Sequence, residues 1–316
     1  MSTLEGTAFD MMIVGRTPAA DGVDMFELAP PAGSTLPRWQ PGSHIDVILP
    51  GGDARQYSLC GAPDAATWRI GVLREGQGRG GSVWMHSLSV GDTVRVAGPR
   101  NHFEFTPERG TNYLFIAGGI GITPIFSMMA AAAAAGVDYT LDYSGRSLST
   151  MALLDELADA HPGRVNLHAA DEGDRLDLDR LFATLKPFTT TYCCGPARLI
   201  EAVEVAARGR QLHVERFEPK ALGAPVLAEP FEVELVYSGL ELTVPPERSI
   251  LDVVEEAGVL VLSSCREGTC GTCETRVMAG EIDHRDSILT PDEQDAQDVM
   301  YICVSRSAGP RLTLEL

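Results

Sequence analysis

The sequence has little positive charge, no long apolar run and no paired histidines, and each absence excludes a class of protein. Lys and Arg number 25 against 44 Asp and Glu, so the net charge is −19 and no nucleic-acid partner is expected. The longest apolar run, residues 125–137, is Ala-rich and too short to cross a bilayer. No apolar stretch follows a basic amino-terminal region, so neither a signal peptide nor a membrane partner is expected.

Histidine and cysteine are also sparse. The seven His residues have no ligand spacing and no Cys-x-His pair occurs, so a Rieske cluster is not expected in this chain. Seven Cys is an odd number, and the neighbours Cys193 and Cys194 are poorly placed for a disulfide. Unpaired thiols predict a reducing compartment, the cytoplasm.

Four of the cysteines have a distinctive spacing. A C-x4-C-x2-C segment is followed by a distant cysteine, at Cys265, Cys270, Cys273 and Cys303. This is the ligand spacing of a plant-type [2Fe–2S] cluster. The alternative is zinc, but zinc sites favour two C-x2-C pairs and this chain has one. Because such a cluster passes one electron at a time, the rest of the chain is expected to supply or remove single electrons.

The negative charge is concentrated at the carboxyl end. From residue 223 onward there are 18 acidic and 6 basic side chains, which gives −12. This excess predicts an acidic docking face for a protein partner. The alternative interpretation is that the charge serves only solubility.

Residues 1–106 have the pattern of many short strands separated by Pro-Gly and Gly-Gly turns. Strands are predicted at residues 8–14, 22–28, 43–49, 56–60, 68–73 and 93–97, with one short helix at 82–88. This arrangement is typical of a small antiparallel β-barrel.

Residues 107–222 alternate between strand and helix. Strands are predicted at 113–117, 139–143, 165–169 and 191–194, and helices after residue 121 through 135 and at 151–161, 178–184 and 199–208. Strict alternation predicts a parallel sheet with helices on both faces.

The remaining residues predict a linker and a third domain. Residues 218–230 contain three prolines and no periodicity, as expected of a linker. A hairpin is predicted over 231–244, followed by a helix that Ser249 caps and that ends at Ala257. Residues 300–304, which include Cys303, are predicted as a strand.

A flavin-binding pattern lies in the predicted barrel. R-Q-Y-S occupies residues 55–58, and G-R-G-G-S at 78–82 opens the short helix. Arg55 and glycine amides at a helix start suit a phosphate. Tyr57 can pack against an aromatic ring system, and the Ser58 hydroxyl can reach its reactive nitrogen. The alternative is a chance match to a short motif.

A nicotinamide-binding pattern lies in the predicted α/β domain. G-G-I-G-I-T-P at residues 118–124 follows a strand and opens a helix, where glycines admit a pyrophosphate. C-G-P at residues 194–196 follows another strand at the carboxyl edge, where α/β sheets bind ligands. The alternative is that both are ordinary strand–helix turns.

In combination, these motifs and their order resemble the phthalate dioxygenase reductase family of the ferredoxin-NADP reductase superfamily, which includes vanillate demethylase reductases. The resemblance covers essentially the whole chain. It implies a multidomain fold with an antiparallel FMN-binding β-barrel at residues 1–106 and an α/β parallel-sheet NAD(H) domain at 107–222. It further implies a linker at 223–230 and an α+β ferredoxin domain of the β-grasp type at 231–316.

The resemblance also implies site residues. Ser58, Thr123, Cys194 and Phe217 are expected around hydride transfer. FMN contacts are expected at Arg55, Gln56, Tyr57, Ser58, Val72, Gly80, Gly81, Ser82 and Phe217. Coenzyme contacts are expected at Gly118, Gly119, Ile120, Gly121, Ile122, Thr123, Cys194, Gly195 and Pro196. FMN is favoured over FAD because no additional loop to hold an adenine follows Ser82.

The choice between NADH and NADPH depends on three further residues. Ser144 and Arg146 follow the second sheet strand, where members of the wider superfamily bind the 2′-phosphate of NADPH. The resembling family usually takes NADH despite similar residues, and Asp142 is able to bond a free ribose hydroxyl. NADH is therefore the predicted donor.

The sequence thus predicts an NADH-dependent reductase component that passes electrons through FMN and a [2Fe–2S] cluster to a separate Rieske-type oxygenase or demethylase of aromatic catabolism. One alternative is a reductase that feeds a cytochrome P450. Another is a redox sensor that carries the same cofactors without turnover. The chain is expected to act as a monomer, and the substrate belongs to the partner.

Overall fold

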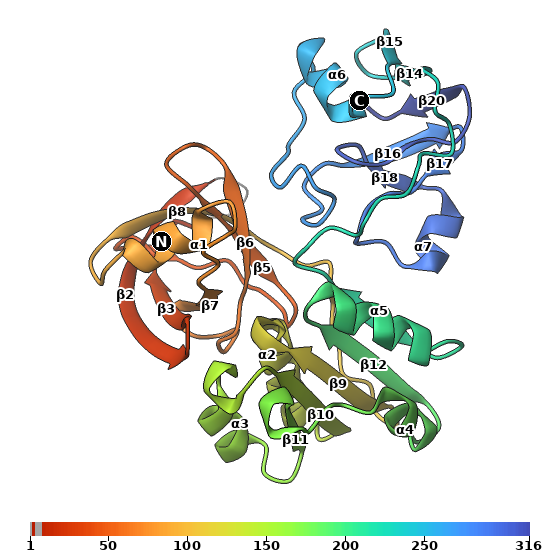
Figure 1. Ribbon diagram of the computed structural model, residues 1–316. Coiled ribbons are helices and arrows are strands. Elements are labelled where there is room, and N and C mark those ends of the chain that lie inside the picture. The colour runs from red at the N-terminus through yellow and green to blue at the C-terminus, as the bar shows by residue number, and fades with distance from the viewer. Residues whose placement is uncertain (1, 4–7) are drawn as a thin grey trace. The chain divides into compact units, whose positions relative to one another are not determined.

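Six antiparallel strands form the barrel that the sequence predicts (Figure 1). The computed structural model describes residues 2–3 and 8–316. The sheet order is β6-β5-β8-β2-β3-β7, and a bridge between Leu59 and Ile70 brings its two edges together. Its strands are β2 (Phe9–Ala20), β3 (Val23–Ala29), β5 (His44–Ile48), β6 (Ala54–Ser58), β7 (Trp68–Leu73) and β8 (Thr93–Arg100). The short helix α1 (Gly81–Ser87) follows β7, and β1 (Ser2–Thr3) pairs with β4 (Ser34–Thr35).

Five parallel strands form the second sheet. They are β9 (Asn112–Gly118), β10 (Asp138–Gly145), β11 (Val165–Ala169), β12 (Thr189–Cys194) and β13 (Leu212–Glu215), in the order β11-β10-β9-β12-β13. After β9 the chain adds β10 and β11 on one side of it, and then crosses over to add β12 and β13 on the other side. A switch point of this kind is where open α/β sheets bind their ligands.

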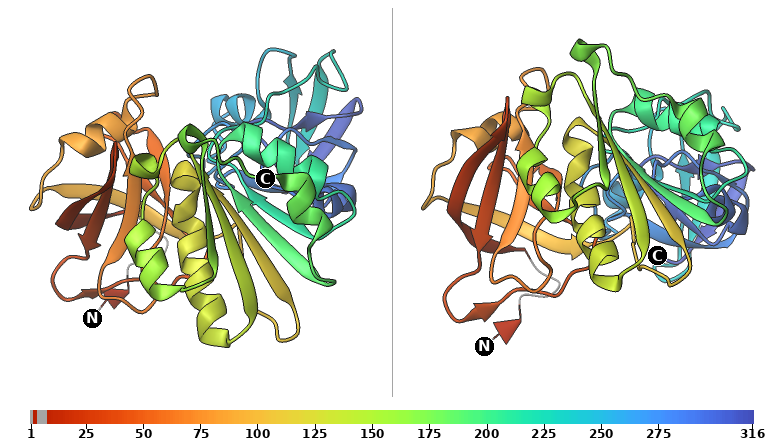
Figure 2. Two further views of the ribbon diagram at one scale, coloured as in Figure 1. Left: turned by 60° about the horizontal axis from the view of Figure 1, so that its bottom comes forward. Right: turned by 90° about the horizontal axis from the view of Figure 1, so that it is seen from below.

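Helices cover both faces of this sheet (Figure 2). The helices are α2 (Ile122–Ala135), α3 (Leu154–Ala160), α4 (Leu178–Ala183) and α5 (Ala197–Ala206). Phe115 of β9 packs in the core with α2 and α3, whereas Leu114 and Ile116 pack with α4 and α5. Successive strand residues point to opposite faces, so β9 is buried on both sides, as its unbroken apolar sequence requires.

Two elements of this domain differ from the prediction. Helix α3 begins three residues later than predicted, because Leu153 adopts a left-handed backbone with φ of 66° after the 3₁₀ turn Leu148–Thr150. Strand β13 was not predicted, since its four half-buried residues give no apolar run. It places Glu215 beside Cys194 in the strand register.

The chain divides into two compact units, Met1–Glu215 and Arg216–Leu316. The second unit holds a mixed sheet in the order β15-β14-β20-β16-β18. Its main elements are β14 (Phe231–Leu235), β15 (Leu240–Val244), α6 (Ile250–Glu256), β16 (Glu274–Ala279), α7 (Pro291–Ala296), β18 (Val299–Tyr301) and β20 (Arg311–Leu314), and β17 (Ile282–Asp283) pairs with β19 (Arg306–Ser307). No regular element occurs in residues 216–230.

Helix α6 begins as the sequence predicts. Ser249 accepts a hydrogen bond from the Asp252 amide, and the Asp252 side chain accepts one from the Ser249 amide, which completes a capping box. One prediction is wrong: β18 ends at Tyr301, so Cys303 lies in a turn rather than on a strand. Val304 and Ser305 both donate backbone hydrogen bonds to the Tyr301 carbonyl, which closes that turn.

Among the residues that the structure describes, no helix is long and apolar enough to cross a membrane.

Candidate functional site

The predicted flavin phosphate site joins β6 to the start of α1. Arg55 lies on β6, and its side chain packs so closely against Gly81 that a Cβ on that glycine would lie 2.6 Å from the Arg55 Cγ. The Arg55 guanidinium donates to the carbonyls of Ala54 at 2.7 Å and Arg79 at 3.2 Å. Gly80 takes a left-handed φ of 82° and no side chain caps α1. The arrangement leaves glycine backbone beside a cationic group, which suits a phosphate.

Neighbouring residues of β6 point in alternate directions. Tyr57 shares a face with Arg55 and packs against the barrel core, and this burial raises the pKa of Tyr57 to about 12 although Arg55 acts to lower it. Gln56 points the other way, and its amide donates to Asp46 at 2.6 Å. Two other predicted contacts have local roles: Val72 is buried on β7, and the Ser82 hydroxyl accepts the Glu75 amide at 2.9 Å.

The two glycine-bearing loops of the α/β sheet are packed against each other. A Cβ on Gly121 would lie 2.3 Å from the Cys194 carbonyl oxygen, and one on Gly118 would lie 2.7 Å from Pro196 and Leu199. Gly119 has a φ of 53°, and its carbonyl accepts a hydrogen bond from Tyr143 at 3.0 Å. Only glycines allow this approach at the carboxyl ends of β9 and β12. The structure therefore brings the predicted segments 118–124 and 194–196 together.

Thr123 brings the barrel and the parallel sheet into contact within the first unit. Its side chain is buried, with the hydroxyl donating to the Ile120 carbonyl at 2.9 Å. Its methyl group faces Gly71 of β7 so closely that a Cβ on that glycine would lie 2.8 Å away. Ile120 packs at the same place, and Ile122 is fully buried in the core behind it. The predicted nicotinamide-binding segment, residues 118–124, is thus held directly against the predicted flavin-binding barrel.

The buried Ser58 and Cys194 and the half-buried Glu215 form a polar group at this junction. The Cys194 thiol lies 3.8 Å from the Glu215 carboxyl. The Ser58 hydroxyl is buried and has no hydrogen-bond partner among the described residues, although it lies close enough to Glu215 to lower that pKa. An orphaned hydroxyl at this position fits a residue that awaits a bound ring.

Burial governs the protonation of this group. It raises the pKa of Glu215 from 4.5 to about 8, with Cys194 and Ser58 offsetting part of the rise. It also raises the pKa of the Cys194 thiol well above 9.0, and the Glu215 charge adds to that rise. Both groups are therefore mainly neutral at pH 7. Glu215 was not among the predicted site residues; a prediction of β13 would have indicated it, because parallel strands end at one edge.

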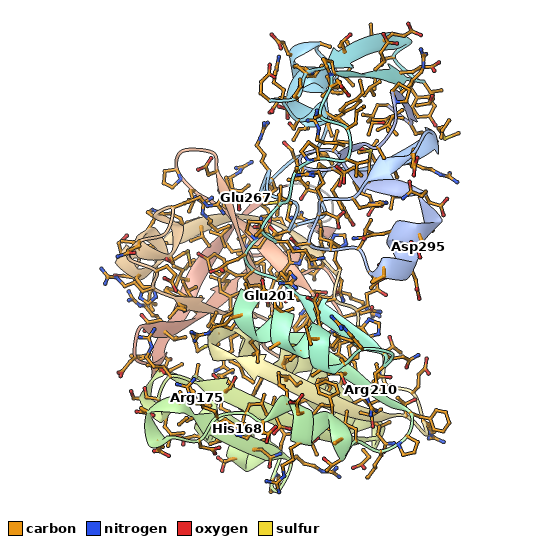
Figure 3. The ribbon with its side chains drawn as sticks, turned by 45° about the vertical axis from the view of Figure 1, so that its right-hand side comes forward. His168, Arg175, Glu201, Arg210, Glu267 and Asp295 are labelled. Atoms are coloured by element: carbon orange, nitrogen blue, oxygen red, sulfur yellow. The ribbon has the colours of Figure 1, made fainter. Side chains whose placement is uncertain are left out.

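The predicted ribose residues lie at the end of β10. Asp142 is buried, and its carboxylate accepts hydrogen bonds from His168 at 2.9 Å and Asn166 at 3.3 Å. His168, labelled in Figure 3, also approaches Asp174 at 3.4 Å. The Ser144 hydroxyl donates to the Ala117 carbonyl at 3.3 Å. The Arg146 carbonyl accepts a hydrogen bond from the backbone amide of Asp171. Asp142 thus already has partners, and a ribose contact from it stays a prediction.

Phe217 lies just beyond the boundary of the first unit. Its side chain is 42% exposed. Its predicted contact with the flavin stays a prediction.

The four predicted cluster ligands are all buried in the second unit. Their thiols interact with one another: Cys265 interacts with Cys270 and Cys303, and Cys303 also interacts with Cys273. Four cysteine thiolates in the C-x4-C-x2-C…C order are the ligand set of a plant-type [2Fe–2S] cluster.

Backbone amides are directed at the cluster thiols. The Glu267 and Thr269 amides donate to the Cys265 Sγ at 3.3 and 3.5 Å, and the Cys265 amide donates to the Cys270 Sγ at 3.4 Å. Such donors stabilise thiolates and tune a cluster's potential. The chemistry and setting of these four sulfurs fit a [2Fe–2S] group.

An ion-pair network holds the cluster loop to α6. Arg266 has a left-handed φ of 57°, which costs free energy in a residue with a side chain. Its guanidinium donates to Asp252 at 3.1 Å and to Glu255 at 2.5 Å, both on α6. Gly268 and Gly271 also take left-handed conformations, as the tight loop requires.

Two family models match the chain. Residues 115–205 match the oxidoreductase NAD-binding domain, and residues 234–308 match the 2Fe-2S iron-sulfur cluster binding domain. The first match lies on the parallel sheet and the second contains all four cluster cysteines.

Curated and solved relatives cover nearly the whole chain. The phenoxybenzoate dioxygenase subunit beta of Ectopseudomonas oleovorans is 43% identical over 303 residues, which are 94% of each chain. The solved phthalate dioxygenase reductase, described as modular for electron transfer from pyridine nucleotides to [2Fe–2S], is 36% identical over 98% of each chain with a TM-score of 0.69. An intact type IV self-sufficient cytochrome P450 monooxygenase is 43% identical over 98% of this chain with a TM-score of 0.92, but this chain spans 41% of it.

These findings confirm the predicted fold class, the cofactor set and the reductase function, while the exact domain limits and the role of each site residue stay predictions. The chain belongs to the phthalate dioxygenase reductase family, as a reductase that transfers electrons from NADH through FMN and a [2Fe–2S] cluster to an oxygenase component.

Proposed function

We propose that NADH binds at the switch point of the parallel sheet, with its nicotinamide beside Thr123 and Cys194. The observation that carries this proposal is the meeting of Ser58 from the barrel with Cys194 and Glu215 from the sheet. FMN, when bound, accepts a hydride from NADH and returns the electrons singly. The chain's own task is to align the two rings and exclude water.

The buried group suits this task. The Ser58 hydroxyl is proposed to donate to the flavin ring, since apart from its interaction with Glu215 it has no partner among the described residues. The Cys194 thiol is fully buried and neutral, so it adds no negative charge behind the proposed nicotinamide site. Glu215, neutral below about pH 8, avoids placing a negative charge where a hydride must arrive. Arg55, Gly80 and Gly81 are proposed to hold the FMN phosphate.

The pH dependence of hydride transfer tests the role of Glu215. Its pKa is raised from 4.5 to about 8, so the wild-type rate of flavin reduction is expected to fall as pH rises through 8. Folded-state stability should also decline between pH 4.5 and 8, because the unfolded chain releases this proton more readily. Glu215→Gln should keep the low-pH rate across the range in stopped-flow measurements.

A control and a contrary result define that test. Glu201→Gln, an exposed position on α5 (Figure 3), should retain the wild-type pH profile. If Glu215→Gln shows the same decline at pH 8 as the wild type, another group titrates and the assignment is wrong.

We further propose that the partner is a Rieske-type oxygenase and that the protein works in the cytoplasm. Three relatives that match over almost their full length are named as reductases of monooxygenase or dioxygenase systems. The cytoplasmic assignment is supported by seven unpaired cysteines. A cytochrome P450 partner is the second candidate, favoured by the match to the reductase part of a fused P450.

Ionic strength distinguishes partner docking from internal electron flow. Residues from 223 onward carry a net charge of −12, so electron transfer to a purified Rieske oxygenase should slow as salt rises. NADH oxidation by ferricyanide, a small acceptor, should change much less. A parallel assay with a P450 that lacks its own reductase compares the two partners. Equal slowing with both kinds of acceptor would contradict charge-guided docking, and faster transfer to the P450 would favour the second candidate.

A further inference from the structure

Asp286 is a buried carboxylate behind the cluster loop, and none of the sequence motifs includes it. It is 2% exposed and lies in the segment between β17 and α7. One carboxylate oxygen accepts the amides of Ile288 at 3.0 Å and Leu289 at 2.8 Å. The other lies 3.5 Å from the Ser305 hydroxyl and 3.7 Å from His284 Nδ1. Burying a carboxylate costs free energy that hydrogen-bond and charge partners must offset. The number of partners around Asp286 therefore suggests that its buried position has a role.

The first connection runs to the three-cysteine loop. Gly268 lies between Cys265 and Cys270, and a Cβ on it would lie 3.1 Å from the Asp286 Cα. The amide of Ser287 donates to the Gly268 carbonyl at 2.9 Å. The loop that carries three ligands therefore rests directly on the backbone that Asp286 organises.

The second connection runs to the turn that carries the fourth ligand. Ser305, fully buried and two residues after Cys303, donates to Asp286 and accepts the Arg285 amide at 3.1 Å. Val304 packs against Gly268 as well, because a Cβ on that glycine would lie 2.6 Å from a Val304 methyl group. The Asp286 backbone thus contacts the three-cysteine loop while its carboxylate accepts from the Cys303 turn, so one residue joins two segments that are distant in sequence and that both hold the cluster.

We propose that Asp286 is a positioning residue for the [2Fe–2S] cluster, which fixes the three-cysteine loop against the Cys303 turn and lowers the cluster's reduction potential through its buried negative charge. Reduction adds one electron, received from the flavin, to a group that four thiolates already make negative. A fixed anion behind the loop opposes that addition, and burial limits the screening by water. The reduced cluster is then the stronger donor to the oxygenase.

The protonation of Asp286 supports a permanent charge. Burial acts to raise its pKa, but His284 and the amides of Leu289 and Ile288 outweigh burial and hold the pKa of Asp286 below 3.8. The carboxylate is therefore ionised at neutral pH.

Three variants of the full-length, cofactor-loaded protein test the proposal. Asp286→Asn keeps the shape and removes the charge. Ser305→Ala keeps the charge and removes the link to the Cys303 turn. Asp295→Asn removes an exposed charge from α7 of the same unit and is the control (Figure 3). The measurements are the cluster's midpoint potential, its electron spin resonance g-values and the rate of iron release to a chelator.

Asp286→Asn is expected to shift the cluster's midpoint potential to a more positive value, while Asp295→Asn stays at the wild-type value. Ser305→Ala is expected to change the g-values and to release iron about 10-fold faster, at the low end of the effect of outer-shell partners on metal affinity. A midpoint potential in Asp286→Asn equal to that of Asp295→Asn overturns the proposal. If Asp286→Asn takes up no cluster, the test rests on Ser305→Ala. Wild-type g-values together with a wild-type rate of iron release in Ser305→Ala would then overturn the proposal.

Discussion

Cys303→Ala is expected to yield a protein that oxidises NADH at its flavin but delivers no electrons to an oxygenase. Cys303 is one of four buried thiols that interact with one another in the second unit. With three ligands, one iron is left without its second thiolate, and the cluster is lost or never assembles. The first unit is unchanged, so NADH should still bleach the flavin absorbance.

Cys193→Ala is the matched control for this variant. Cys193 is a fully buried thiol in the core of the parallel sheet and lies outside the ligand set. It should retain the cluster's visible absorbance, its iron content and oxygenase-coupled turnover. Undiminished oxygenase turnover in Cys303→Ala would show that electrons reach the partner without the cluster.

Gly121→Ala is expected to weaken NADH binding by about 10- to 100-fold and to slow reduction of every acceptor. A Cβ at this position would lie 2.3 Å from the Cys194 carbonyl oxygen and 2.7 Å from the Gly195 nitrogen. Overpacking of this kind costs about 1–3 kcal/mol, and each 1.4 kcal/mol is about a tenfold change in affinity. Stopped-flow flavin reduction at several NADH concentrations measures the change.

Gly51→Ala serves as the control because nothing lies within 4 Å of its Cβ position and its backbone is not left-handed. It should bind NADH as the wild type does. A Gly121→Ala variant with wild-type NADH affinity would mean that the two glycine-bearing loops separate without cost, contrary to the close packing at the switch point.

Much of the site could be predicted from sequence because its chemistry is local. The C-x4-C-x2-C spacing lies within one loop, and glycines 118, 119 and 121 sit in one strand–helix turn, so their roles depend on backbone geometry over a few residues. The strands of the barrel and four of the five strands of the parallel sheet were also predicted, since their apolar patterns are strong. The Ser249 cap was found for the same reason.

Features that depend on contacts between distant segments could not be predicted. Glu215 belongs to the site only because β13 pairs with β12, and β13 has no strong apolar pattern. The hydrogen bonds that Asp142 accepts from His168 and Asn166 arise from the pairing of β10 with β11 and were not predicted. Asp286 meets Gly268 and Ser305 through tertiary contacts alone.

An anaerobic titration with NADH, followed by absorbance and electron spin resonance, tests the electron route most directly. The account predicts loss of flavin absorbance and then a rhombic [2Fe–2S] signal, with two electrons stored for each NADH consumed. Flavin reduction with no cluster signal, in protein whose iron content is complete, would contradict it.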